Sequence, residues 1–317
     1  MSATRLTVSV VIAAYSDERW DYLREAVASA LAQTRPALEV VVVVDHNPAL
    51  LARARRELPL VTVLPNTGAR GASGSRNTGV AACHGDVLAF LDDDARASAG
   101  WLEALLGHFA DAGVVGAGGR VDPLWAGSRP SWFPPEFDWT IGASYHGMPL
   151  DAGPVRNVWS NNMAIRRSAF EAAGGFREGF GKIGTTSRPE DTDLCLRATA
   201  AGGTAGTWVY EPAGLTGHWV PRQRATVGYF LRRCFHEGRG KAGLAALDGA
   251  AASTSAERHY ARHVLPSGLV RGLRETMRGD RSGALRSTAI AAGFGMAATG
   301  FAVGMLASVI SPGGDSR

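Results

Sequence analysis

The chain has 317 residues, of which 45% are hydrophobic and 20% are charged, a composition that is ordinary for a globular protein and excludes a disordered one. Its formal net charge of +4 does not indicate a nucleic-acid-binding protein. The three cysteines (Cys83, Cys195 and Cys234) are far apart and odd in number, so a disulfide framework or a zinc site is not expected. The length accommodates one sizeable α/β domain with an appendage, or two small domains.

The first hundred residues alternate between two hydrophobic periods. Buried parallel strands are predicted from short runs of β-branched residues at Val8–Ala14, Glu39–Val44, Val61–Leu64 and Val87–Leu91. Helical patterns lie between and after them, at Trp20–Gln33, Ala49–Glu57, Ser75–Cys83 and Trp101–Phe109. This alternation predicts a doubly wound α/β sheet, with ligands bound at the carboxyl ends of its strands.

The middle of the chain is less regular. The segment from Gly116 to Val158 is rich in Gly, Pro and Trp, and predicts an irregular loop region over the sheet, because this composition fits neither a long helix nor a central strand. Further elements are predicted as helices at Arg167–Ala173 and from Asp191 to Ala200, and as strands at Gly206–Tyr210 and Gly214–Gly217.

Basic residues accumulate after Pro221, and residues 287–310 then contain no charged side chain. This last segment is long enough to span a membrane, which takes ~20 apolar residues. A helix packed on the rest of the chain, or lying in the membrane interface, stays open as the alternative. Gly300, Gly304 and Ser308 recur at four-residue spacing and indicate a helix-packing face.

These features predict a catalytic domain at 1–221, a basic interfacial region at 222–286, a transmembrane helix at 287–310 and a polar tail at 311–317. The N-terminal apolar run lacks the basic flank and cleavage pattern of a signal peptide. The arginines that precede residue 287 place the preceding domain on the cytoplasmic side of a cell membrane.

Three adjacent carboxylates, Asp92, Asp93 and Asp94, directly follow the fourth predicted strand. They repel one another unless a cation neutralises them, and Mg²⁺ or Mn²⁺ accepts such ligands together with phosphate oxygens. A solvated acidic turn is the alternative. Neutral His218 is a candidate to complete the metal shell, although a histidine beside a tryptophan is more often structural.

Two other segments carry candidate chemistry. The glycine-rich stretch from Gly71 to Gly79 contains Arg76 and Asn77 at the start of a predicted helix, which suits an anionic diphosphate or serves as a plain connector. Glu190 and Asp191 precede an amphipathic helix and are candidates for a general base that deprotonates an acceptor hydroxyl. Their alternative role is to interact favourably with the helix dipole.

Taken together, residues 6 to 240 resemble glycosyltransferase family 2. The resemblance rests on the order and spacing of Tyr15 after the first strand, Asp45 after the second, Gly-Ser-Arg76-Asn77-Thr-Gly, Asp92–Asp94, Asn161-Asn162-Met-Ala-Ile-Arg-Arg, Gly174-Gly175-Phe176, Glu190-Asp191-x-Asp-Leu-Cys-x-Arg and His218. One departure is His46-Asn47-Pro48, where the family usually has Asp-Gly-Ser after the residue that corresponds to Asp45.

The resemblance implies a GT-A fold, a Rossmann-like mixed and mainly parallel sheet with helices on both faces. Nucleotide-sugar contacts are implied for Tyr15, Asp45, Arg76, Asn77, Asp92 and Asp93. A divalent metal, Mn²⁺ or Mg²⁺, is implied on Asp92, Asp94 and His218. Asp191, with Glu190 beside it, is implied as the base, and Trp159, Asn161, Asn162 and Arg188 are candidate contacts to the sugar or the acceptor.

A narrower similarity, over Ser128–Trp139, Tyr145–Pro149 and Val155–Asn157, is to glucosyl-dolichyl-phosphate glucuronosyltransferases and related enzymes acting on polyprenyl-linked glycans. It implies an inverting, non-processive transfer from a UDP-hexose or UDP-glucuronate to a lipid-linked saccharide or cell-surface glycan precursor at a membrane. A polyprenyl-phosphate sugar synthase and a catalytically inactive membrane scaffold remain the alternatives. A processive synthase is disfavoured because a Gln-x-x-Arg-Trp motif is absent.

Overall fold

The computed structural model describes residues 6–183, 186–201, 206–248 and 255–310. The chain forms two compact units. The sheet unit comprises Met1–Asp122, Pro149–Ile183 and Glu190–Trp219, and the helical unit comprises Pro123–Met148, Gly184–Pro189 and Val220–Arg317. The helical unit resumes at Val220, two residues before the predicted start at residue 222, and it also takes in a segment from the middle of the chain. The predicted polar tail at 311–317 lies outside the described residues.

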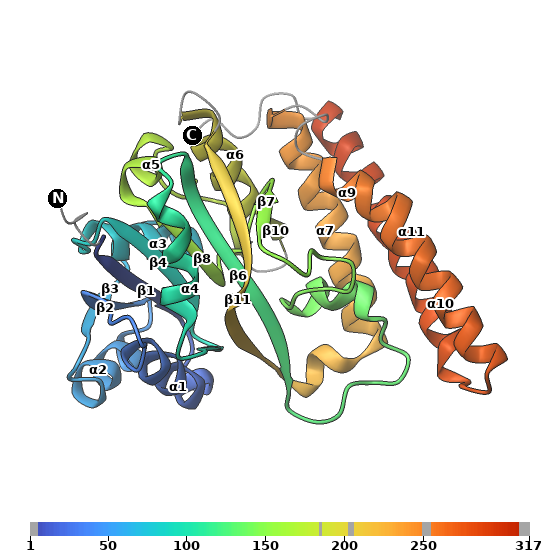
Figure 1. Ribbon diagram of the computed structural model, residues 1–317, viewed down its shortest axis with the longest axis horizontal. Coiled ribbons are helices and arrows are strands. Elements are labelled where there is room, and N and C mark those ends of the chain that lie inside the picture. Colours follow the sequence, from blue (N-terminus) through green and yellow to red (C-terminus); the bar gives the residue numbers. More distant parts are fainter. Residues whose placement is uncertain (1–5, 184–185, 202–205, 249–254, 311–317) are drawn as a thin grey trace. The chain divides into compact units, whose positions relative to one another are not determined.

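A nine-stranded mixed sheet is the centre of the sheet unit, with the order β3-β2-β1-β4-β8-β6-β11-β5 and with β7 paired to β11 (Figure 1). Its strands are β1 (Val8–Ala14), β2 (Glu39–Val44), β3 (Thr62–Pro65), β4 (Val87–Asp92), β5 (Ala95–Ala97), β6 (Val114–Trp125), β7 (Gly153–Val155), β8 (Asn162–Arg166) and β11 (Thr207–Val220). The first four pair in parallel, whereas β8 pairs antiparallel with β4 and β6. The sheet is mixed, as predicted, but its parallel part is confined to β3-β2-β1-β4.

Helices cover both faces of this sheet. Successive residues of a strand point to opposite faces, so β1 contributes Val10 and Ile12 to one core cluster and Val11 to the other. The first cluster includes side chains of α1 (Trp20–Leu31), α2 (Pro48–Glu57) and α4 (Trp101–Gly107). The second includes side chains of α3 (Ala72–Ala81), α5 (Arg167–Ala172) and α6 (Glu190–Ala201). This is the two-sided covering that the strand–helix alternation predicts.

The prediction of an irregular loop from Gly116 to Val158 was wrong over its first ten residues, which belong to β6, and over Gly153–Val155, which form β7. Glycine weakens an isolated strand, but here it permits close packing across the sheet. A Cβ atom at Gly116 would lie 2.2 Å from the Trp208 ring, and one at Gly119 would lie 1.7 Å from the Gly214 carbonyl oxygen. The two short strands predicted near 206–217 are likewise one continuous strand, β11.

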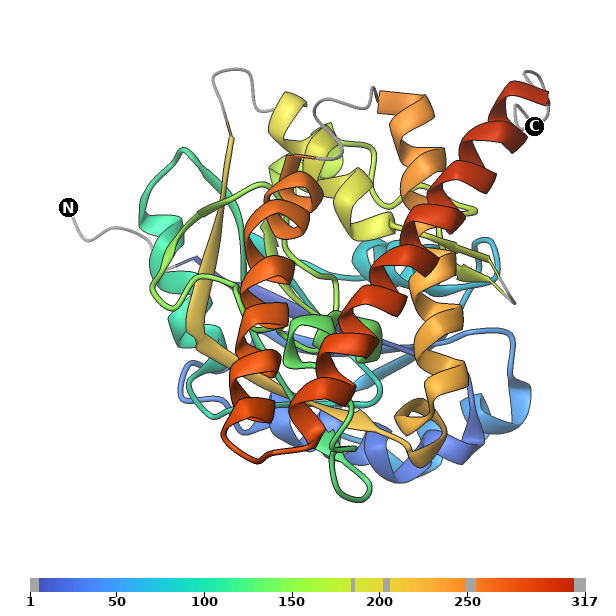
Figure 2. The same ribbon diagram turned by 90° about the vertical axis from the view of Figure 1, so that its right-hand side faces the viewer.

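The helical unit is built around aromatic side chains. Its elements are η3 (Pro135–Ile141), β10 (Thr186–Arg188), η4 (Arg222–Ala225), α7 (Val227–Asp248), α9 (Ser255–His259), the π-helical turn η5 (Tyr260–Val264), α10 (Leu265–Met277) and α11 (Ser282–Ile310). Phe133, Phe137 and Phe230 belong to its core, and the Phe230 ring centroid lies 5.5 Å from that of Phe133 and 5.2 Å from that of Phe137. The helices α10 and α11 run antiparallel beside each other, as Figure 2 shows.

Glycines bring α7 and α11 into backbone contact. A Cβ atom at Gly300 would lie 2.0 Å from the Phe235 carbonyl oxygen, and one at Gly238 would lie 1.9 Å from that of Ala297. A Cβ atom at Gly304 would lie 2.6 Å from the Ala242 methyl group. Gly300 and Gly304 thus form the packing face that their spacing predicts, whereas the side chain of Ser308 lies outside the described residues.

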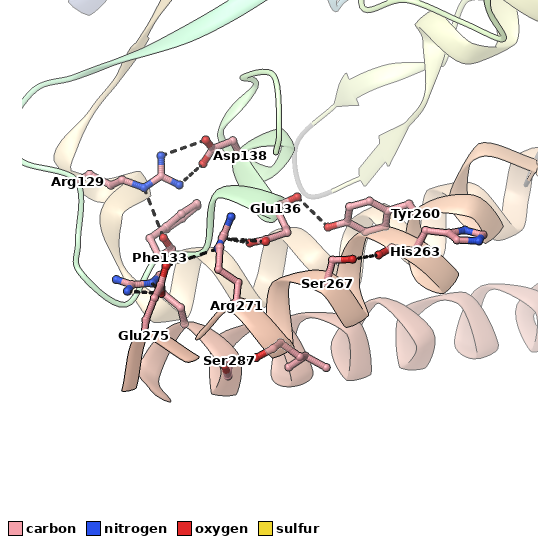
Figure 3. A network of polar contacts seen from close by, with 12 residues as sticks. Arg129, Phe133, Glu136, Asp138, Tyr260, His263, Ser267, Arg271, Glu275 and Ser287 are labelled. Atoms are coloured by element: carbon pink, nitrogen blue, oxygen red, sulfur yellow. Dashed lines mark hydrogen bonds and ion pairs between the residues drawn. The ribbon is translucent and has the colours of Figure 1, made fainter. Parts of the chain in front are cut away.

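A chain of ion pairs fixes the loop at 129–138 to α10 and α11 (Figure 3). Arg129 binds Asp138 through two hydrogen bonds of 2.6 and 3.0 Å. The Arg271 Nη2 atom lies 2.8 and 3.0 Å from the two oxygens of Glu136, a side chain that is fully buried. These pairs account for the acidic and basic residues among the aromatic residues of this loop.

Candidate active site

The three adjacent carboxylates lie where β4 turns into β5. Asp92 ends β4, and Asp93 and Asp94 form the turn that leads into β5. Since β5 pairs antiparallel with β11, Ala95 lies opposite His218 in the sheet. The His218 Nε2 atom is consequently 3.2 Å from an Asp94 oxygen, although the two residues are far apart in the sequence.

Asp92, Asp94 and His218 fit a divalent metal ion. Each can offer one ligand atom, and these atoms all lie within 4.8 Å of one another. Asp94 and His218 are buried, and the His218 Nδ1 atom and one Asp93 oxygen have no hydrogen-bond partner among the described residues. Two carboxylates and an imidazole form a donor set that can hold a divalent metal ion.

Arg19, at the end of the short helix η1 (Asp17–Arg19), is part of this site and was missed by the sequence analysis. Its Nη1 atom lies 2.6 Å from an Asp93 oxygen and 3.0 Å from an Asp94 oxygen. Burial raises the pKa of Asp93 to about 7, Asp94 and Asp92 add to this rise, and Arg19 opposes it. Arg19 could have been found from the parallel pairing of β1 with β4, because this pairing brings the segments after both strands to one edge of the sheet.

Arg76 joins the first turn of α6 to the carboxylates at the end of β4. Its buried guanidinium lies 2.8 Å from an Asp92 oxygen and 3.2 Å from a Glu190 oxygen. Burial raises the pKa of Glu190 to about 7, Asp191 adds to this rise, and Arg76 opposes it. Residues that are remote in sequence therefore form one charged cluster around a single arginine.

Asp191, the predicted base, is half-buried in the first turn of α6. One of its carboxylate oxygens accepts a hydrogen bond of 2.6 Å from the backbone N–H of Thr192. This contact fixes the side chain at the helix N-terminus, where a negative charge is stabilised. Its neighbour Glu190 binds Arg76 instead, so the two adjacent acids have different surroundings.

Tyr15 and Asp45 follow neighbouring parallel strands and lie at the same edge of the sheet, as predicted. Tyr15 is 53% exposed, with the Arg19 guanidinium 4.9 Å from the centre of its ring. Asp45 accepts hydrogen bonds from the Asn66 amide at 2.7 Å and from the Gly71 N–H at 2.9 Å. Asp45 thereby fixes the start of α3, the helix that carries Arg76.

Two predicted contact residues use their side-chain amides inside the protein. Asn77 donates to the Phe176 carbonyl oxygen at 2.8 Å and accepts from the Phe176 N–H at 3.0 Å. Asn162 accepts a hydrogen bond from the Trp101 indole and donates to the backbone carbonyls of Arg120 and Gly214. This geometry gives both asparagines a structural role.

The other three candidates for sugar or acceptor contact differ in position. Trp159 is half-buried just before β8, and Asn161 is buried beside it in the sequence. Arg188 ends β10 and belongs to the helical unit. Trp159 and Asn161 therefore share a segment of the sheet unit, whereas Arg188 belongs to a different unit.

The fold and the site define a glycosyltransferase of the GT-A type. The profile of Glycosyl transferase family 2 matches residues 9–174, and the chain belongs to this family. It is 32% identical to a glucosyl-dolichyl phosphate glucuronosyltransferase from Haloferax volcanii over 74% of this chain and 76% of that protein. It is also 36% identical to a pre-mycofactocin glycosyltransferase from Mycobacterium tuberculosis, over 51% of this chain and 35% of that one.

Solved structures show the same fold at low identity. A mannosyltransferase from Pyrobaculum calidifontis, in complex with GDP-Man and Mn²⁺, has a TM-score of 0.55 and 18% identity, and the match covers 99% of this chain and 89% of that one. GalNAc-T7, with UDP, GalNAc and Mn²⁺, has a TM-score of 0.54 and 16% identity, over 82% of this chain and 54% of that one. The predicted fold class and family are therefore confirmed.

Proposed function

We propose that this chain is an inverting, metal-dependent and non-processive glycosyltransferase. It moves a hexosyl or glucuronosyl group from a UDP-sugar to a hydroxyl of a polyprenyl- or dolichyl-phosphate-linked saccharide. The observation that carries this proposal is the convergence of Asp92, Asp94 and His218 at metal-ligand spacing, joined through Arg76 to the acidic first turn of α6. The glucuronosyltransferase of Haloferax volcanii supports the choice of donor and acceptor.

The donor binds along the carboxyl edge of β1, β2 and β4. Tyr15 offers an exposed aromatic face for the nucleobase, and Asp45 holds the loop beside it. A divalent cation bound by Asp92, Asp94 and His218 supplies positive charge that stabilises the departing nucleoside diphosphate. Arg19 and Arg76 orient the carboxylates of the β4–β5 turn around that position.

The chemical step is a single displacement. Asp191 accepts the proton of the acceptor hydroxyl as the hydroxyl oxygen attacks the anomeric carbon. The bond from that carbon to the diphosphate oxygen breaks, and its electron pair leaves with the diphosphate. Attack from the opposite side inverts the anomeric configuration, so an α-linked donor gives a β-linked product.

The same proposal places the protein at a cell membrane with the sheet unit in the cytoplasm. Ser282–Ala307 form one helix that is long and apolar enough to cross a membrane, and the arginines that precede it suit the anionic cytoplasmic leaflet whether the helix crosses the membrane or lies on it. A lipid-linked acceptor is presented at such a surface, which supports this location.

A donor-hydrolysis screen tests the proposal. The detergent-solubilised protein is incubated with Mn²⁺ and a panel of UDP-, GDP- and dTDP-sugars, with and without a polyprenyl-linked saccharide, and released nucleotide is measured. One UDP-sugar is expected to turn over in the wild type and in Asp21→Asn, an exposed acid on α1, but not in Asp191→Asn. The absence of both turnover and Mn²⁺-dependent UDP binding would refute the assignment.

A separate experiment distinguishes a saccharide hydroxyl from a polyprenyl phosphate as the acceptor. Glycosylation of a polyprenyl phosphate needs no base, because the attacking phosphate oxygen is already ionised. Unchanged turnover of Asp191→Asn on polyprenyl phosphate would therefore identify the chain as a polyprenyl-phosphate sugar synthase.

A further inference from the structure

The helices α10 and α11 carry most of the large apolar side chains that are exposed among the described residues. These side chains are Val270, Leu273, Met277, Leu285, Phe294, Val303, Met305 and Leu306. Met277, at the end of α10, is 80% exposed. Within the most apolar stretch of α11, 22% of the residues are buried by the rest of the chain. So large an apolar surface on one helix pair indicates a binding partner or a membrane.

Four exposed arginines border this surface: Arg262, Arg274, Arg278 and Arg281. None of them has a carboxylate partner within the part of the chain that the structure describes. The nearby acids Glu275 and Asp280 are both bound to Arg286 at 2.6 Å. The border of the apolar surface is consequently cationic, which is complementary to the headgroups of anionic lipids.

The packing of α7 disfavours a simple membrane span by α11. The half of α11 that contains Gly300 and Gly304 is in backbone contact with α7 between Phe235 and Ala242. That stretch of α7 carries Glu237, Arg239 and Lys241. If α11 crossed the bilayer in this arrangement, these charges would enter the hydrocarbon at the same depth, where charged side chains are strongly disfavoured.

We propose that the outer surface of α10 and α11 lies in the headgroup region of an anionic membrane as an interfacial anchor. The tip of the helix pair, with Leu273, Met277 and Leu285, enters the boundary of the acyl chains, and the bordering arginines bind lipid phosphates. The small inner face of α11 stays on α7, so one helix serves both packing and membrane binding. This inference rests on the proposed function for the choice of a membrane as the partner.

Vesicle flotation of the 317-residue chain tests whether this surface binds a membrane. The wild type is expected to bind vesicles of phosphatidylcholine with phosphatidylglycerol, and to bind pure phosphatidylcholine vesicles more weakly. The double variant Leu273→Asp, Met277→Asp should lose at least about tenfold in vesicle affinity, since it removes buried apolar area at the tip. The triple variant Arg274→Gln, Arg278→Gln, Arg281→Gln should lose about fivefold per charge on anionic vesicles only.

Leu60→Asp is the matched control, because Leu60 is as exposed as Met277 but lies in the sheet unit. It should bind vesicles like the wild type, and thermal unfolding should show that all variants fold. Unchanged vesicle binding by both the double aspartate variant and the triple glutamine variant would overturn the proposal. The proposal would also be overturned if the wild type were a dimer in solution and Leu273→Asp, Met277→Asp a monomer with unchanged vesicle binding. That result would identify a second copy of the chain as the partner of this surface.

The depth of a fluorescent label in the bilayer distinguishes an interfacial anchor from a membrane-spanning helix. The three native cysteines are buried, so Met277→Cys and Phe294→Cys can each be labelled selectively with an environment-sensitive fluorophore. Quenching by brominated lipids should place both labels at a similar shallow depth, and alkaline carbonate should extract the protein. A Phe294→Cys label at the bilayer centre, in protein that resists extraction, would overturn the proposal in favour of a span.

These experiments use no donor or acceptor, so their outcome is separate from that of the proposed function. Vesicle binding without Mn²⁺-dependent nucleotide binding would refute the proposed transferase and leave the anchor standing. Nucleotide binding without vesicle binding would refute the anchor alone.

Discussion

Each unit of this protein contains a cluster of carboxylates and arginines, and the two clusters differ in how the charges are arranged. In the sheet unit, Asp92, Asp94 and His218 converge on one point, with one possible ligand atom of each within 4.8 Å of the others. In the helical unit, the charges form a chain of pairs that joins a loop to two helices (Figure 3). Convergence of several possible ligand atoms on one point indicates a ligand site, and serial pairing indicates structure.

The largest expected effect tests the convergent cluster. Asp94→Asn removes a charge from the proposed metal-binding group and should lower transferase activity by about 10²- to 10³-fold, the range for losing one transition-state-stabilising group. Calorimetry should show that Mn²⁺-dependent UDP binding is lost. Asp138→Asn, in the paired cluster, should bind UDP normally, and equal losses in both variants would break the comparison.

The next effect tests the paired cluster. Arg271→Met leaves the fully buried Glu136 without its cation, and should lower the free energy of unfolding by about 3 kcal/mol in urea denaturation. Nucleotide binding should stay at the wild-type level. The double variant Arg271→Met, Glu136→Gln should recover much of the stability, because it also removes the unpaired charge. No recovery would show that packing, and not the ion pair, is what Arg271 contributes.

A pH effect of intermediate size is expected from Glu190. Its pKa rises from 4.5 in the unfolded chain to about 7 in the folded one, so the folded state holds more protons between these values. The free energy of unfolding should therefore fall as the pH rises from about 5 to 8, by on the order of 2 kcal/mol from this group.

Glu190→Gln should remove this component of the pH dependence. The measurement is urea denaturation of both proteins in metal-free buffer across the same pH range. Identical slopes for the wild type and the variant would mean that the half-buried Glu190 stays ionised through its contact with Arg76.

The smallest effect concerns a neutral contact in the sheet unit. Trp101→Phe removes the indole hydrogen bond to Asn162, which is 2.8 Å long and buried, and should cost about 1 to 2 kcal/mol of stability. UDP binding should be unchanged, as expected for a structural asparagine. If the variant kept its stability but lost sugar transfer, Asn162 would instead be a residue of the substrate site.

Local patterns predicted much of the fold. The four parallel strands and the helices between them follow from hydrophobic periodicity and turn residues, which depend on near neighbours in the chain. The parallel arrangement then brings Tyr15, Asp45 and Asp92 to one edge, which is why these candidates could be named in advance. The strand β6 could not be predicted, because its glycines are explained only by Trp208 and Gly214 across the sheet.

The sequence by itself determined the family, the strand–helix alternation and the residues that meet at the strand ends, because each is encoded in short segments of fixed order. Only the tertiary structure decided the partners of those residues. It showed that Arg19 binds the β4–β5 turn, that Arg76 joins Asp92 to Glu190, and that Asn77 and Asn162 hold the fold together. Such contacts join segments distant in the chain, where spacing in sequence carries no information about spacing in the folded protein.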